Sequence, residues 1–209
     1  MLNNNIEEII FSLKDYHYLV ASKYFTAEEI RNLYQFGIRD FGENRCQDFL
    51  EKYQALKDLD ITWHFIGHLQ TNKVSSVINK IDYLHSLDSI HLASYIEKYR
   101  IEPLKVFIQI KLTENENKYG IKEEDIYSFL EKVKDFKTIE VIGLMGMVDA
   151  NMTNCEKAFH YQKLALLREN LNKQGYPNIK EISAGMTNDY KIASQAGATI
   201  VRLGSIFKR

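Results

Sequence analysis

Hydrophobic and polar positions alternate along the chain between two patterns, short apolar runs and longer stretches with helical spacing. Apolar residues between 6 and 13 recur at intervals of three and four, which is typical of an amphipathic helix. The apolar run 19–22 then predicts a strand. Thr26 and Glu29 form a capping-box pattern that begins the next helix, and Gly37 ends it.

The same alternation continues to the C-terminus and fixes the expected fold class. Strands are predicted at residues 19–22, 38–41, 61–66, 82–85, 104–110, 139–145, 180–182 and 199–203. Helices are predicted at residues 6–13, 26–37, 43–56, 71–78, 89–99, 126–133, 155–172 and 188–196. Strands that are separated by helical crossovers pair in parallel. Eight such units predict a closed (β/α)8 barrel of the TIM type with an extra N-terminal helix, and an open doubly wound sheet is the alternative.

Composition narrows the class of protein. The 209 residues include 27 Lys and Arg against 28 Asp and Glu, which gives a net charge of −1. A nucleic-acid binder that ignores sequence usually carries a large basic excess, so we expect no nucleic-acid partner. The chain has 2 prolines and no Gly/Ser-rich or Pro-rich linker, which indicates one domain over residues 1–209.

Cysteine content and the absence of long apolar runs indicate the compartment. Cys46 and Cys155 are too few for a disulfide framework or a zinc site, so we interpret them as free thiols. Residues 1–5 lack the basic region of a signal peptide, and no apolar run reaches the roughly 20 residues of a membrane helix. We therefore expect a cytoplasmic monomer with no membrane partner.

Two loops carry residues suited to binding phosphate. Active sites of such barrels lie at the C-terminal ends of the strands, and phosphate often binds after strands seven and eight. Residues 183–188 follow the seventh strand and offer hydroxyls, a glycine and the start of a helix, while Gly204 and Ser205 follow the eighth. The alternative is that Thr187 or Asn188 only caps a helix.

Arg202 and Lys23 add two cations to the same end of the predicted barrel. Alternation along the last strand makes Arg202 a buried residue, which needs either a ligand or a carboxylate partner. Lys23 ends the first strand, where a lysine is commonly a surface charge but can form a Schiff base in a partly desolvated pocket. A lysine, an arginine and a phosphate site together indicate a pocket for a phosphorylated aldehyde or ketone.

Histidines and a tyrosine near the same rim are the remaining candidates. His64 and His68 are four residues apart, but His64 falls within a strand and Gly67 intervenes, so we expect no metal site. His64 is interpreted as a hydrogen-bonded core residue. Lys118 and Tyr119 follow the fifth strand, where they either approach the mouth of the pocket or turn the chain.

These residues belong to a series of blocks that resembles a known family. The blocks are residues 20–23, 41–44, 63–73, 118–121, 143–145, 185–187 and 201–204, of which 63–73 (Trp-His-Phe-Ile-Gly-His-Leu-Gln-Thr-Asn-Lys) is the longest. From about residue 19 to residue 209 the chain resembles the pyridoxal phosphate homeostasis proteins. These are single-domain relatives of the N-terminal barrel of alanine racemase.

The resemblance implies a barrel that binds pyridoxal 5′-phosphate and sharpens the role of each candidate. It implies that Lys23 forms the Schiff base, that Arg202 approaches the pyridine nitrogen and that Asn44 lines the same end of the barrel. The phosphate-binding segments that it implies contain Ser183, Gly185, Met186, Thr187, Gly204 and Ser205.

Two physical points favour a carrier over an enzyme. An arginine beside the pyridine nitrogen disfavours ring protonation, which weakens the ring as an electron sink. Racemization needs a base on each face of the substrate carbon, and Lys23 supplies only one. We therefore predict a homeostasis protein with no assigned catalytic residue and with apo pyridoxal phosphate enzymes as candidate recipients. The alternatives are a slow amino-acid racemase that uses Tyr119 and a Schiff-base aldolase that needs no cofactor.

Overall fold

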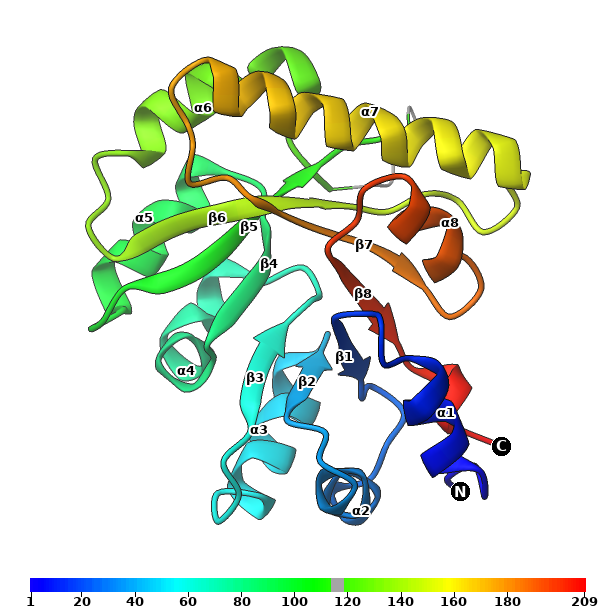
Figure 1. Ribbon diagram of the computed structural model, residues 1–209. Coiled ribbons are helices and arrows are strands. Elements are labelled where there is room, and N and C mark those ends of the chain that lie inside the picture. Colours follow the sequence, from blue (N-terminus) through cyan, green and yellow to red (C-terminus); the bar gives the residue numbers. More distant parts are fainter. Residues whose placement is uncertain (114–118) are drawn as a thin grey trace.

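The computed structural model describes residues 1–113 and 119–209, and its strands close into a parallel barrel (Figure 1). Neighbouring strands pair in sequence order, and β1 also pairs with β8. The strands are β1 (Tyr18–Ala21), β2 (Asp40–Glu43), β3 (Thr62–Phe65), β4 (Tyr83–Leu87), β5 (Leu104–Ile110), β6 (Ile139–Gly146), β7 (Glu181–Met186) and β8 (Ile200–Leu203). The predicted TIM-type barrel is confirmed, and the open sheet is excluded.

Helices follow the strands and cover the outside of the barrel, with the long α7 lying across one side in Figure 1. They are α1 (Ile6–Ser12), α2 (Ala27–Gln35), α3 (Cys46–Ala55), α4 (Val74–Val77), α5 (Ile90–Tyr99), α6 (Ile126–Val133), α7 (Asn154–Lys173) and α8 (Tyr190–Gln195). The extra N-terminal helix is α1, as predicted. Among the described residues, no helix is long and apolar enough to span a membrane.

Local signals explain where helices begin and end. Thr26 accepts a hydrogen bond from the backbone N–H of Glu29, and the Glu29 side chain accepts one from the backbone of Thr26. This reciprocal pair satisfies two N–H groups that the first turn of a helix leaves free. At the other end Gly37 adopts φ 90°, and its N–H donates to Tyr34 O while Ile38 N–H donates to Leu33 O. Glycine tolerates this left-handed conformation, so α2 ends there.

Strand register brings the ends of β1, β2 and β8 to one rim. Ala21 lies opposite Gly42 on β2, and Val20 lies opposite Leu203 on β8. Residues just beyond these pairs therefore emerge side by side at the C-terminal end of the barrel. Gly204 allows the close approach, since a Cβ atom there would lie 2.9 Å from the carbonyl oxygen of Ala21.

The chain termini meet on the outside of the barrel beside α1 (Figure 1). Leu2 forms an antiparallel bridge with Lys208, and the backbone N–H of Asn3 donates to Phe207 O at 3.0 Å. Glu29 of α2 accepts hydrogen bonds from Lys208 Nζ at 2.7 and 2.9 Å. The N-terminal segment, α2 and the C-terminus are thereby tied together.

Several elements differ from the sequence prediction in their bounds. The second strand extends through Glu43 and α3 begins only at Cys46, whereas the pattern assigned Glu43 to the helix. The seventh strand extends to Met186 because Ser183 and the small residues that follow it are buried in the barrel wall. The helix predicted at 71–78 is one α-helical turn flanked by short 3-10 turns.

Candidate functional site

A cavity of about 410 Å³ opens at the C-terminal ends of the strands. This is the end of the barrel at which the sequence predicted a site. Its polar lining comes from β8, from the loops after β1, β2, β7 and β8, and from α7: Lys23, Asn44, Lys157, Thr187, Asn188, Asp189, Arg202, Gly204 and Ser205. Its apolar lining includes Ile66, Met147, Val148 and Met186. The volume and this mixture of groups are typical of small-ligand sites.

Lys23 lies two residues beyond the end of β1 and lines the cavity. Its side chain is exposed, and its Nζ atom lies 4.9 Å from the centroid of the Tyr24 ring. The backbone beneath it is firmly held, because the N–H of Ser22 donates to Gly42 O at 2.9 Å. The amine of Lys23 is therefore accessible at the rim while its attachment to the barrel is fixed.

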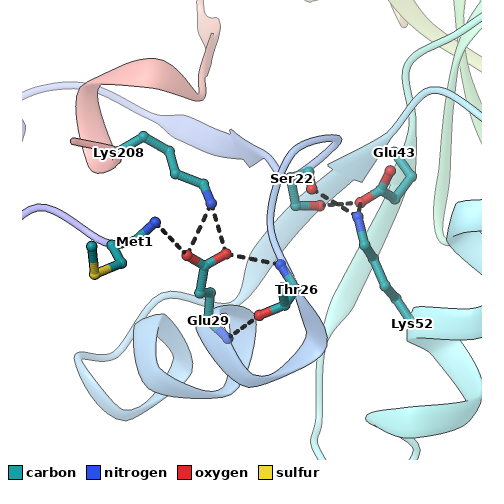
Figure 2. Close-up of polar contacts among 7 residues, drawn as sticks. All are labelled: Met1, Ser22, Thr26, Glu29, Glu43, Lys52 and Lys208. Atoms are coloured by element: carbon teal, nitrogen blue, oxygen red, sulfur yellow. Dashed lines mark hydrogen bonds and ion pairs between the residues drawn. The ribbon is translucent and has the colours of Figure 1, made fainter.

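A buried ion pair supports this part of the rim (Figure 2). Lys52 of α3 donates to Glu43 Oε1 at 2.6 Å and to the carbonyl oxygen of Ser22 at 2.8 Å. The Ser22 hydroxyl donates to the same Glu43 oxygen at 2.7 Å. Glu43 is fully buried, and the Lys52 side chain is 11% exposed. Since Ser22 precedes Lys23 and Glu43 precedes Asn44, this cluster positions both cavity residues.

Asn44 lines the cavity and has a hydrogen-bond acceptor that is unused in the described structure. Its Oδ1 atom is buried and has no hydrogen-bond partner among the described residues. Gly67 packs directly against its backbone, since a Cβ atom there would lie 2.2 Å from the carbonyl oxygen of Asn44. This contact explains why glycine is needed after β3, and it restricts the backbone of Asn44.

The loops after β7 and β8 are connected to each other across the cavity wall. Thr187 Oγ1 accepts a hydrogen bond from the backbone N–H of Gly204 at 3.3 Å, which leaves the hydroxyl hydrogen of Thr187 free to donate. Asp189 holds the first loop by accepting from the N–H of Met186 at 2.6 Å. Gly185 adopts φ 86°, a conformation that lets the chain turn into this loop, but it does not line the cavity.

Arg202 lies at the floor of the cavity and is 4% exposed, so its predicted burial is confirmed. Its Nη1 atom donates to the carbonyl oxygen and to the hydroxyl of Ser183, both at 2.8 Å, and Nη2 donates to Gly146 O at 3.3 Å. Burial lowers the pKa of Arg202 to about 10, while nearby Tyr161 and Asp189 raise it. The guanidinium is therefore still charged at neutral pH.

Ser183 does not lie where the sequence pattern assigned it. It is inside β7 rather than in the loop that follows, and its side chain is fully buried. Its hydroxyl accepts from Arg202 and contacts His85 Nδ1 at 2.8 Å, so it does not line the cavity. The strand continues through Ser183 because its hydroxyl finds these two partners inside the barrel.

A chain of hydrogen bonds continues from Ser183 through the barrel interior. His85 Nε2 lies 2.9 Å from His64 Nδ1, and His64 Nε2 lies 3.0 Å from Asp40 Oδ1. Burial lowers the pKa of both histidines, so each is a neutral ring with one donor and one acceptor. Because Asp40 only accepts, every donor along the chain points from Arg202 towards Asp40. The interpretation of His64 as a hydrogen-bonded core residue is confirmed.

His68 and Tyr119 lie together outside the cavity lining. Their rings stack with centroids 3.7 Å apart, and His68 Nδ1 lies 3.1 Å from Asp88 Oδ2. Tyr119 is 57% exposed. Lys118 lies outside the described residues. Within residues 1–113 and 119–209, no cluster of three His, Cys, Asp or Glu side chains is arranged to hold a metal ion.

Lys157 is a cavity residue that the sequence analysis missed. It lies in the first half of α7 and is only 7% exposed. Tyr161 and Leu164 follow it at four and seven positions, so it occupies an inward position on the apolar stripe of the helix. A lysine on an otherwise apolar stripe was the available signal.

The comparisons with known proteins agree with this geometry. The family model described as "Alanine racemase, N-terminal domain" matches residues 19–207. A pyridoxal phosphate homeostasis protein from Aquifex aeolicus is 39% identical over 192 residues, which cover 90% of this chain and 84% of that protein. The chain belongs to the pyridoxal phosphate homeostasis protein family.

Other members of this family extend the similarity over nearly the whole chain. The Synechocystis homeostasis protein is 36% identical over 204 residues, covering 95% of this chain and 94% of that protein. The structure of PipY from Synechococcus elongatus with pyridoxal phosphate bound superimposes with a TM-score of 0.90. It is 30% identical and covers 97% of this chain and 100% of that chain. The resemblance inferred from the sequence blocks is thus confirmed.

Proposed function

We propose that this chain, acting as a single domain over residues 1–209, binds pyridoxal phosphate and takes part in vitamin B6 homeostasis. The observation that carries the proposal is the convergence of Lys23, Asn44, Arg202 and the β7 and β8 loops on one cavity. The pyridoxal phosphate bound to PipY, at 30% identity and near-complete coverage, supports this ligand.

The residues present fit this cofactor. The buried Oδ1 atom of Asn44 has no hydrogen-bond partner among the described residues, so a hydrogen-bond donor on a bound ligand would satisfy an acceptor that is costly to leave unpaired. Thr187 offers a free hydroxyl hydrogen, and Ser205 adds an exposed hydroxyl on the same wall. The two hydroxyls can donate to a phosphate monoester, which carries about −1.5 to −2 charges near pH 7.

Each cavity residue has a distinct part in this proposal. The cofactor supplies an aldehyde that condenses reversibly with amines, and Lys23 is the amine that we assign to the Schiff base. Thr187, Gly204, Ser205 and Met186 surround the phosphate. Arg202 faces the ring nitrogen, where its positive charge disfavours ring protonation. Ser183 and Gly185 do not line the cavity and support it indirectly. Ser183 accepts a hydrogen bond from Arg202, and Gly185 allows the backbone conformation of the loop after β7.

Carrier function is favoured over catalysis by the arrangement at the rim. Lys23 is exposed, so a second amine can reach the same position and take the cofactor away. Tyr119, the candidate second base of a racemase, is stacked on His68 and does not line the cavity in the part of the chain that the structure describes. We therefore propose a monomeric carrier with apo pyridoxal phosphate enzymes as recipients and no reaction of its own.

A transfer assay tests this function. The protein loaded with pyridoxal phosphate is mixed with an apo-enzyme that depends on it, and recovery of that enzyme's activity is followed over time. We expect complete transfer, and no multiple-turnover racemization, decarboxylation or transamination of common amino acids by the carrier alone. Sustained racemization that disappears in Lys23→Ala would replace the carrier proposal with the racemase. A protein that never takes up pyridoxal phosphate would favour the aldolase.

A further inference from the structure

Lys157 is a largely buried lysine whose ammonium group has no partner among the described residues. The residue is 7% exposed and lines the cavity, yet no hydrogen bond or ion pair joins its Nζ atom to any residue among 1–113 and 119–209. Other inward residues of α7 are apolar or paired, such as Tyr161, whose hydroxyl donates to Asp189 at 3.1 Å. A lysine with so little exposed surface normally has a counter-charge, so an unpaired lysine in the lining of the cavity indicates an anionic ligand.

The obvious internal counter-ion is already engaged. Asp189 is the only carboxylate among the described residues that line the cavity, and it is 6% exposed. One of its oxygens accepts from the Tyr161 hydroxyl and the other accepts from the backbone N–H of Met186. Its role is to hold the loop after β7 against α7. The described lining of the cavity therefore contains three cationic side chains, Lys23, Lys157 and Arg202, and one carboxylate, Asp189.

The position of Lys157 specifies which part of a ligand it faces. It precedes Tyr161 by one helical turn, so both side chains lie on the same face of α7. Tyr161 contacts Asp189, which belongs to the segment 186–189 that also contains Thr187. Lys157 therefore approaches the cavity from the side of the β7 loop, whereas Lys23 approaches from β1.

We propose that Lys157 binds the phosphate group of the ligand and supplies the main positive charge that neutralises it. This inference rests on the proposed function and adds a residue to it. The loops supply hydroxyl and backbone donors, which are neutral, and Arg202 is engaged with Ser183 and Gly146. Without Lys157, a phosphate dianion would receive hydrogen bonds from neutral donors alone. A hydrogen bond from an ammonium group to a phosphate is stronger than one from a neutral donor.

Paired titrations with pyridoxal phosphate and unphosphorylated pyridoxal test the assignment. Lys157→Met keeps the length and the burial of the side chain but removes the charge. We expect its dissociation constant for pyridoxal phosphate to rise by roughly 10- to 100-fold, while that for pyridoxal changes by less than about 3-fold. Lys157→Arg keeps the charge and should recover most of the affinity. Lys163→Met, on the same helix but 51% exposed, is the matched control and should behave like the wild type.

Wild-type protein gives a second readout that does not depend on a variant folding. Acetylation of lysines by acetic anhydride, mapped by mass spectrometry, should be slowed at Lys157 by inorganic phosphate and by pyridoxal phosphate but not by pyridoxal. Equal affinity losses for both ligands, or unchanged acetylation of Lys157, would overturn the assignment. If the wild type binds pyridoxal phosphate and Lys157→Met binds it equally well, only this inference fails. If the wild type does not bind it, the proposed function fails as well.

Discussion

Replacing Lys52 by Met tests whether the buried ion pair beneath the rim holds that part of the barrel together. The change removes the hydrogen bonds to Glu43 Oε1 and to the carbonyl oxygen of Ser22, at 2.6 and 2.8 Å. It leaves a fully buried carboxylate whose remaining partner in the described chain is the Ser22 hydroxyl. Removing one member of a buried pair costs roughly 3–5 kcal/mol, and we expect about 3 because Lys52 is slightly exposed.

Urea unfolding followed by the fluorescence of Trp63, the chain's single tryptophan, measures this loss. Lys57→Met, an exposed lysine just past the end of α3, is the control and should stay within about 0.5 kcal/mol of the wild type. The double variant Glu43→Gln with Lys52→Met should lose less than the sum of the two single changes, because it leaves no unpaired charge. A Lys52→Met protein as stable as the control would refute the reasoning.

Three further predictions follow from other contacts. Burial alone would raise the pKa of Glu29 from 4.5, but hydrogen bonds from Lys208 and the Thr26 backbone lower it to about 2. The stabilisation of the wild type relative to Glu29→Gln should therefore be complete above pH 4.5 and disappear as the pH falls towards 2, whereas a constant difference in urea unfolding would contradict it. Gly185→Ala should reduce the free energy of unfolding by more than about 1 kcal/mol, because φ is 86° and the new Cβ would lie 2.6 Å from that of Ala193; an unchanged denaturation midpoint would count against this. Ser183→Ala should reduce the free energy of unfolding by about 1–3 kcal/mol, because Arg202 Nη1 and His85 Nδ1 each lose a partner. It should weaken the binding of pyridoxal phosphate and of pyridoxal equally, and a selective loss for the phosphorylated ligand would place Ser183 at the phosphate.

Features encoded by local sequence were predictable. The capping box at Thr26, the turn at Gly37 and the alternation of strands with helices depend on neighbouring residues, and all three appear in the structure. Parallel pairing then follows from the crossovers, and the C-terminal rim follows from the barrel. The burial of Arg202 could be predicted from the barrel as well, since residues on a barrel strand alternate between two covered faces.

Features that depend on a distant partner were not predictable. Glu43 continues a strand because its buried carboxylate forms an ion pair with Lys52. Ser183 stays in the barrel wall because its hydroxyl forms hydrogen bonds with His85 and Arg202. A pattern of polar and apolar residues treats all these side chains as solvent-facing. The leucines of α7 define the helix in the sequence pattern, so the pattern does not single out Lys157, although this residue lies on the same stripe.

The central claim is that Lys23 holds pyridoxal phosphate at this rim, and reductive trapping tests it most directly. The loaded protein is reduced with borohydride, digested and mapped by mass spectrometry, with Lys23→Ala treated in parallel. We predict one dominant pyridoxyl-phosphate adduct on the peptide that contains Lys23, and loss of that adduct in the variant. An adduct confined to Lys73, Lys157 or another lysine, with Lys23 unmodified, would contradict the account.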